Sequence, residues 1–163
     1  MKNYLFILLF ILFSFTGCNY SVSKEKELPN IVLILADDMG YGDPQCYNSN
    51  SKIPTPNINN LAANGIMFTD AHTNSSVCTP TRYGLITGQY SWRGPLKKGV
   101  TWSYDTLIID KNRETVATLL KKAGYNTACV GKWHLGLGWQ TTGDSILFNA
   151  PLTASPNDLG FDY

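Results

Sequence analysis

Three short segments of the chain carry side chains that can bind an anion, hold a metal ion or act as a nucleophile or base: residues 37–38, 78–82 and 131–136. In the second segment, Pro80 favours the first turn of a helix through Thr81 to Thr87, which Gly88 can end in the left-handed conformation. Cys78 then lies just before the helix N-terminus, where free N–H groups and the helix dipole attract negative charge. A cysteine there is typically a thiolate nucleophile, and Arg82 offers a fork for a tetrahedral oxyanion. The alternative is a half-buried cysteine in a loop.

Asp37 and Asp38 follow the apolar run Ile31 to Ala36 directly. A short continuous apolar run predicts a central strand of a parallel sheet that is covered on both faces. Ligands of open α/β sheets bind beyond the carboxyl ends of the strands, which is where this pair falls. Adjacent carboxylates repel each other unless a cation holds them, and their oxygens suit calcium or magnesium better than zinc. The alternative is an Asp cap on a turn beside a solvated Asp.

The third segment follows a predicted helix over residues 114–123, with Gly124 as its stop, and a predicted strand over residues 125–130. This order places Lys132 and His134 at a strand end. Their alternation puts both side chains on one face, where Lys132 supplies a point charge and His134 can exchange a proton near neutral pH. Taken singly, such a Lys is most often a solvated charge and such a His a satisfied hydrogen-bonding group.

The string Cys78-Thr79-Pro80-Thr81-Arg82, with Leu85 and Thr87-Gly88 behind it, resembles the signature by which sulfatases mark a cysteine for conversion to formylglycine. The segment Gly131 to Gly136 and the stretch Gly160 to Tyr163 also resemble sulfatase motifs. From about Pro29 onward the chain is therefore similar to the N-terminal part of a type I, arylsulfatase-like sulfatase of the alkaline phosphatase-like superfamily. The resemblance implies an α/β fold, a mixed or parallel sheet flanked by helices, of which only the N-terminal part is present.

The resemblance also implies a role for each site residue. Cys78 is the formylglycine precursor, Arg82 stabilises the formylglycine, and Lys132 and His134 are catalytic groups. The implied ligands of a divalent metal, usually calcium and less often magnesium, are Asp37, Asp38 and Cys78. The mechanism implied is attack on sulfur by one hydroxyl of the hydrated aldehyde, with cations stabilising the sulfate oxygens. His134 then takes the proton of the remaining hydroxyl, so that sulfate is expelled.

The expected substrate is a sulfated carbohydrate or an aryl sulfate, and the expected partner is the enzyme that generates formylglycine. Two alternatives stay open. A phosphodiesterase or phosphonate hydrolase of the same superfamily would use the same cations on a tetrahedral phosphate. A glycan-binding lipoprotein would keep the pocket without catalysis. Sulfatases are longer than this chain and draw further groups from downstream, so we expect a truncated catalytic domain over residues 29–163 that is inactive by itself.

The N-terminus predicts export. Lys2 precedes an apolar run from Tyr4 to Phe15 that is short for a membrane span, and Thr16-Gly17-Cys18 resembles a bacterial lipobox. We expect a signal peptide over residues 1–17, lipid attachment at Cys18 and a polar tether over residues 18–28, which together place the protein in the periplasm or at the cell surface. A plain secretory peptide is the alternative.

Charge and cysteine content exclude some function classes. Thirteen basic and 12 acidic residues give a formal net charge of +1, which offers no electrostatic basis for binding nucleic acid. If Cys18 and Cys78 are both modified, Cys46 and Cys129 are the cysteines that remain. A disulfide between them is possible in an oxidising compartment, but Cys129 falls in a predicted buried strand and is expected to be free.

Overall fold

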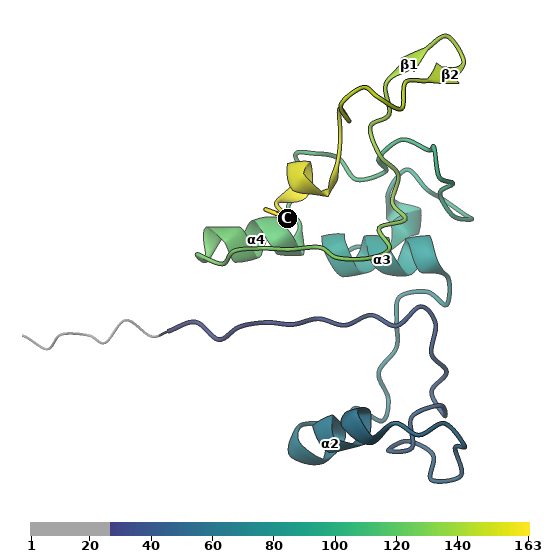
Figure 1. Ribbon diagram of the computed structural model, residues 1–163, viewed down its shortest axis with the longest axis vertical. Coiled ribbons are helices and arrows are strands. Elements are labelled where there is room, and N and C mark those ends of the chain that lie inside the picture. Colours follow the sequence, from purple (N-terminus) through teal and green to yellow (C-terminus); the bar gives the residue numbers. More distant parts are fainter. Residues whose placement is uncertain (1–26) are drawn as a thin grey trace, which may run out of the picture. The chain divides into compact units, whose positions relative to one another are not determined.

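The computed structural model of this chain describes residues 27–163 (Figure 1). The predicted signal peptide over residues 1–17, the predicted lipid attachment at Cys18 and all but the last two residues of the predicted tether over 18–28 lie outside the described residues. The chain divides into two compact units, Met1–Ala36 and Asp37–Tyr163. Within residues 27–163, no helix has both the length and the apolar character needed to cross a bilayer.

The second unit is built from short helices, turns and one small hairpin, in the order shown by the colours of Figure 1. Its elements are α2 (Pro56–Asn64), α3 (Cys78–Thr87), the 3-10 turn η1 (Ser91–Arg93), α4 (Val116–Lys122), β1 (Thr141–Thr142), β2 (Ser145–Ile146) and the 3-10 turn η2 (Pro156–Leu159). The two strands pair in antiparallel fashion, with Thr141 opposite Ile146.

Helix α3 forms where the sequence predicts it, one turn earlier at its start. Pro80 is tolerated in the first turn because the N–H it lacks would have no partner inside the helix. At the other end Gly88 has a φ of 64° and its N–H donates to the carbonyl oxygen of Gly84, which closes the helix as predicted. The correction concerns Cys78, which is the first residue of α3 and not the residue before it, because Val77 is the N-cap.

Helix α4 is also confirmed, with narrower bounds than the predicted 114–123. Thr115 caps it by accepting a hydrogen bond from the N–H of Thr118, and the Thr118 hydroxyl accepts one from the N–H of Thr115. This reciprocal pair begins the helix at Val116. Gly124, with a φ of 92°, follows its end as predicted.

The two strands predicted to carry the site are not regular strands in the structure. Residues 31–36 have no strand pairing within the described part of the chain, and Val32 and Ile34 are 81% and 86% exposed. A strand is stable only when neighbouring strands satisfy its N–H and C=O groups and cover its faces. The apolar run is therefore present without the neighbours that would make it a central strand.

Residues 125–130 lie instead beside the last residues of the chain. The N–H of Tyr163 donates to the carbonyl oxygen of Thr127 at 3.2 Å, and the N–H of Cys129 donates to that of Tyr163 at 2.7 Å. This alternation is the hydrogen-bond pattern of parallel strands, although it extends over a single bridge. Asp162 strengthens the contact because its carboxylate accepts from the N–H and hydroxyl of Thr127.

A small core joins the segments that carry the candidate site. Its fully or nearly fully buried members are Tyr83 of α3, Ile109, Leu135 and Leu159 of η2. Partly buried side chains pack around them, namely Ile86, Leu107, Ile108 and Trp133. Core residues thus alternate with site residues along the chain: Tyr83 follows Arg82, and Trp133 and Leu135 flank His134. Burial of these neighbours fixes the positions of the polar side chains between them.

Candidate active site

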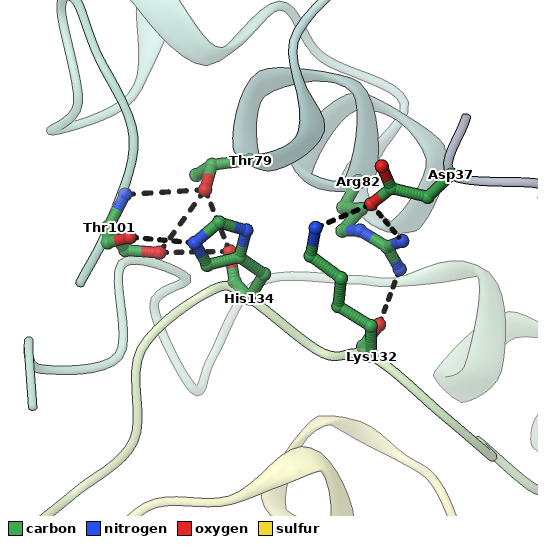
Figure 2. Close-up of polar contacts among 6 residues, drawn as sticks. All are labelled: Asp37, Thr79, Arg82, Thr101, Lys132 and His134. Carbon is green, nitrogen blue, oxygen red and sulfur yellow. Dashed lines mark hydrogen bonds and ion pairs between the residues drawn. The ribbon is translucent and has the colours of Figure 1, made fainter. Parts of the chain in front are cut away.

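The candidate site lies along one face of α3 and gathers segments that are distant in the sequence (Figure 2). Cys78 and Arg82 are four residues apart in α3, so they lie on neighbouring turns of the same face. From that face Arg82 contacts Asp37 and Lys132, and Thr79 contacts His134. The structure therefore brings together residues from all three of the segments singled out in the sequence.

Asp37 is held between two cations. Its Oδ2 atom lies 2.6 Å from Nζ of Lys132 and 2.9 Å from Nη2 of Arg82. The hydrogen bond from Lys132, and next that from Arg82, hold the pKa of the Asp37 carboxyl below its usual value. Asp37 is therefore ionised at neutral pH, and one of its oxygens already serves both cations.

Arg82 joins Asp37 to the third segment. Its Nη2 atom donates to Asp37, and its Nη1 atom donates to the main-chain carbonyl oxygen of Lys132. The side chain is largely covered, at 13% exposed, and its Nε atom is buried without a hydrogen-bond partner among residues 27–163. A guanidinium offers five N–H donors, and in this arrangement one of them, at Nε, is buried and unpaired within the described residues.

His134 has an unusual backbone and one available ring nitrogen. Its φ is 58°, in the left-handed region that non-glycine residues seldom adopt. Its Nε2 atom lies 2.8 Å from the main-chain carbonyl oxygen of Thr101. A carbonyl oxygen can only accept, so Nε2 carries the hydrogen, and Nδ1 of the neutral ring is left as an acceptor. That Nδ1 atom is buried and has no hydrogen-bond partner in the part of the chain that the structure describes.

Two threonines that the sequence analysis did not select hold the same histidine. The hydroxyls of Thr79 and Thr101 each lie 2.9 Å from the carbonyl oxygen of His134 (Figure 2). Thr79 follows Cys78 directly in the motif, and this position could have marked it as a candidate site residue from the sequence. Thr101 lies in a loop between η1 and α4, and no sequence pattern marks it.

Cys78 begins α3 as a free, partly buried thiol. The N–H groups of Cys78 and Thr79 belong to the first turn, which has no partners inside the helix, and the positive end of the helix dipole is here. Within residues 27–163, Cys46 and Cys129 are free as well. Burial raises the pKa of the Cys129 thiol, while the positive charge of Arg82 acts in the opposite direction.

The metal-ligand set predicted from the sequence, Asp37, Asp38 and Cys78, stays a prediction. Asp37 and Asp38 offer carboxylate oxygens, the donors that calcium and magnesium prefer. Calcium takes roughly six to eight such oxygens. Within residues 27–163, however, no three His, Cys, Asp or Glu side chains come together to hold a metal ion. The described residues thus fit a divalent cation only as part of its ligand shell, and a metal role for Cys78 stays a prediction.

The arrangement has the properties of a site for a tetrahedral anion. Arg82 and Lys132 bring two positive charges to the helix that begins with Cys78. One buried N–H donor and one buried nitrogen acceptor, Arg82 Nε and His134 Nδ1, have no partner among the described residues. Such a site can hold anionic oxygens and remove one proton beside them, which is what group transfer from an ester requires.

Comparison with known proteins finds sulfatases that are similar to most of this chain. The family model described as Sulfatase matches residues 29–163. An N-acetylgalactosamine-6-O-sulfatase of Bacteroides thetaiotaomicron is 45% identical over 152 residues, which cover 91% of this chain and 29% of that protein. Human arylsulfatase A is 46% identical over 110 residues, covering 68% of this chain and 22% of that protein.

Solved structures agree in fold. A structure from work on the metabolism of multiple glycosaminoglycans by Bacteroides thetaiotaomicron superposes with a TM-score of 0.74 at 46% identity. The match covers 83% of this chain and 27% of that one. The expected fold class, the N-terminal part of an alkaline phosphatase-like α/β fold, is thereby confirmed. The chain spans about 22% to 29% of the length of the relatives named above.

Proposed function

This chain belongs to the sulfatase family, and from that premise we propose that its protein hydrolyses sulfate esters with the residues gathered on α3. The observation that carries the proposal is the meeting of Arg82 and Lys132 on the helix that begins with Cys78, beside a histidine nitrogen without a partner. A sulfate ester needs this combination of cations, nucleophile and proton acceptor.

The two cations bind and orient the sulfate. Lys132 presents a compact ammonium at the rim, where its side chain is 48% exposed. Arg82 is more deeply placed, at 13% exposed, and its Nε has no hydrogen-bond partner among residues 27–163. Together they stabilise the negative charge that spreads over the sulfate oxygens as the ester bond breaks. Asp37 holds both cations in place through its single Oδ2 atom.

Residue 78 supplies the nucleophile. Oxidation of Cys78 to formylglycine provides a hydrated aldehyde whose hydroxyl attacks sulfur, and which later releases sulfate without water attacking it. The helix N-terminus around residue 78 favours the negative charge that such a group develops. Formation of formylglycine requires a dedicated maturation enzyme, which we propose as a partner of this protein.

His134 acts as the proton acceptor through Nδ1. Because Nε2 donates to Thr101, Nδ1 is the nitrogen with a free lone pair, and it is shielded from solvent. A shielded acceptor takes its proton from the group it contacts and not from water. In this proposal that group is the hydroxyl retained on residue 78.

A divalent metal completes the proposed site, with calcium preferred to magnesium. Asp37 and Asp38 would hold it, and the ion would supply positive charge to the sulfate oxygens. The described residues provide only part of the ligand shell. We therefore propose that other residues of the whole protein supply the remaining metal ligands. Asp38 contributes a second carboxylate beside the ionised Asp37.

For the substrate we propose a sulfated carbohydrate, with aryl sulfates as simpler substitutes. The support is the name of one relative, an N-acetylgalactosamine-6-O-sulfatase that is similar over 91% of this chain. For the location we propose an exported lipoprotein with its lipid on Cys18, at the bacterial periplasm or cell surface, on the support of the sequence pattern at residues 1–18. Radiolabelled palmitate incorporation, lost in Cys18→Ala, is the corresponding measurement.

The decisive experiment compares matched sulfate and phosphate esters of one alcohol, with the intact protein made in a host that generates formylglycine. We expect hydrolysis of the sulfate ester, loss of turnover in Cys78→Ala and a formylglycine mass at residue 78. A strong preference for the phosphate ester would favour a phosphodiesterase and refute the proposal. Glycan binding that survives in Cys78→Ala, without turnover in the parent, would favour a non-catalytic protein.

A further inference from the structure

We propose that Thr79 and Thr101 are positioning residues for His134, which hold its main-chain carbonyl and determine which ring nitrogen carries the proton. The inference rests on the proposed function, in which Nδ1 of His134 accepts a proton. Neither threonine contacts the substrate in this proposal. They act through the histidine alone.

The first support is the hydrogen bonding at the carbonyl of His134. The Thr79 and Thr101 side chains come from α3 and from the loop before α4, and these residues are 0% and 1% exposed. Each hydroxyl lies 2.9 Å from the carbonyl oxygen, which has two lone pairs and can accept from both. The N–H of Thr101 donates in turn to Oγ1 of Thr79 at 3.2 Å. Removing the Thr79 hydroxyl would leave the buried N–H of Thr101 without its acceptor, and removing either hydroxyl would take one of the two donors from the carbonyl oxygen of His134.

The second support is the backbone conformation that this carbonyl belongs to. Within residues 27–163, His134 is the only non-glycine residue with a positive φ. A non-glycine residue keeps such a backbone conformation where the surrounding contacts impose it. The contacts here are the two hydroxyls at the carbonyl of His134 and the burial of the next residue, Leu135. We infer that the threonine pair holds the backbone of His134 in the left-handed region.

The third support is the ring itself. Nε2 donates to the main-chain carbonyl oxygen of Thr101 at 2.8 Å, so one residue contacts the histidine at both its ring and its carbonyl. This bond fixes the tautomer, with the hydrogen on Nε2 and the lone pair on Nδ1. Thr79 takes part because its Oγ1 atom accepts a hydrogen bond from the N–H of Thr101. In this proposal that bond determines where the Thr101 carbonyl lies.

The arrangement also links the base to the nucleophile. Thr79 follows Cys78 directly in α3, and its hydroxyl is bonded to the residue that supplies the base. One turn later, Arg82 donates to the carbonyl oxygen of Lys132, two residues before His134. The helix thus holds residues 132–134 at two points. A shift of His134 relative to residue 78 is resisted by the Thr79 bond in particular.

The test uses Thr79→Val and Thr101→Val in the intact protein, with isotope-labelled histidine. Valine has nearly the shape of threonine but no hydroxyl. Nitrogen NMR gives the tautomer of His134, whose ring signals are assigned by their loss in His134→Gln. The parent is expected to show hydrogen on Nε2 only, and Thr79→Val a mixture of tautomers.

Kinetics provide the second readout. Misplacement of a catalytic group by about 1 Å can cost roughly 100-fold in rate, so we expect Thr79→Val to lower kcat by at least about 10-fold. We expect KM to stay within about threefold, because the cations that bind sulfate are unchanged. Thr79→Ser keeps the hydroxyl and should restore both the tautomer and kcat. Rates are expressed per molecule of formylglycine, measured by peptide mass, because Thr79 lies inside the maturation motif.

A matched control separates positioning from loss of stability. Thr115 is another buried threonine, 2% exposed, and its hydroxyl donates to the carbonyl oxygen of Leu159 outside the site. Thr115→Val should lower stability while leaving the His134 tautomer and kcat as in the parent. If Thr79→Val does not fold, Thr101→Val gives the same test through the second hydroxyl.

The proposal is overturned if a folded Thr79→Val or Thr101→Val protein keeps the parental tautomer and a kcat within about twofold of the parent. It is also overturned if Thr115→Val changes the tautomer as much as they do. The ring signals do not depend on turnover. A parent that hydrolyses no sulfate ester but shows the expected tautomers would refute the proposed function and leave the positioning role intact.

Discussion

Replacing Lys132 by methionine removes one of the two positive charges of the site and keeps the main-chain carbonyl to which Arg82 donates. The side chain of Lys132 is 48% exposed, so its charge acts through a medium between protein surface and water. With an effective dielectric constant of about 40, a unit charge about 4 Å from an anionic oxygen contributes roughly 2 kcal/mol. That energy corresponds to about 30-fold in rate. We therefore expect Lys132→Met to lower kcat/KM by about 30-fold.

The assay is hydrolysis of one sulfate ester by the intact protein at low ionic strength, with rates expressed per molecule of formylglycine. Lys132→Arg keeps the charge and should lose less than about fivefold. Added salt should reduce the difference between parent and Lys132→Met, because exposed charges are screened. Both comparisons isolate the charge from the shape of the side chain.

The matched control is Lys122→Met. Lys122 also forms an ion pair, with Glu114, and lowers the pKa of that carboxyl, but it lies in α4 outside the site. Its loss should leave kcat/KM within about twofold of the parent. If Lys132→Met is within threefold of the parent, or if Lys122→Met falls as far, the reasoning that Lys132 acts by its charge on sulfate is refuted.

Two further predictions concern stability. Lys132 and Arg82 lower the pKa of Asp37 in the folded protein, so the ion pairs of Asp37 stabilise the fold at pH values above its ordinary pKa of 3.8, and this stabilisation is lost as the pH falls through the lowered pKa. The free energy of unfolding should therefore be larger for the parent than for Asp37→Asn at pH 6, and the two values should converge in strong acid. A difference that grows in acid would contradict this. Gly136→Ala should lower the free energy of unfolding by about 3 kcal/mol in urea titrations, because its φ is 78° and a Cβ atom would lie 1.9 Å from the carbonyl oxygen of Thr106. Gly124→Ala, at a φ of 92° with nothing within 4 Å, should cost only about 1 to 2 kcal/mol, and equal losses at both glycines would show that crowding at Gly136 is not the cause.

The predicted strands show where sequence reasoning fails. The prediction of a covered central strand over residues 31–36 is wrong for the described residues, because burial depends on neighbouring strands and none pairs with this run there. Lys132 and His134 are placed by a different route from the predicted strand end, and their catalytic roles stay a prediction. They lie on the site because Trp133 and Leu135 enter the core, while the left-handed His134 departs from a regular strand.

The sequence alone determined the local features. Pro80 and Gly88 set the limits of α3, and the spacing within that helix placed Arg82 one turn from Cys78, because helix starts, helix ends and same-face neighbours depend on residues only a few positions apart. The motif resemblance extended this to the family and its nucleophile.

Only the tertiary structure decided the partners. Arg82 meets Asp37 across 45 residues of sequence and the carbonyl of Lys132 across 50, and Thr79 meets His134 across 55. Which ring nitrogen of His134 is available followed from Thr101, a residue with no local signal. Contacts of this range exist because a common core of buried side chains brings the segments together, and packing of that kind is a property of the whole fold and not of any short stretch of sequence.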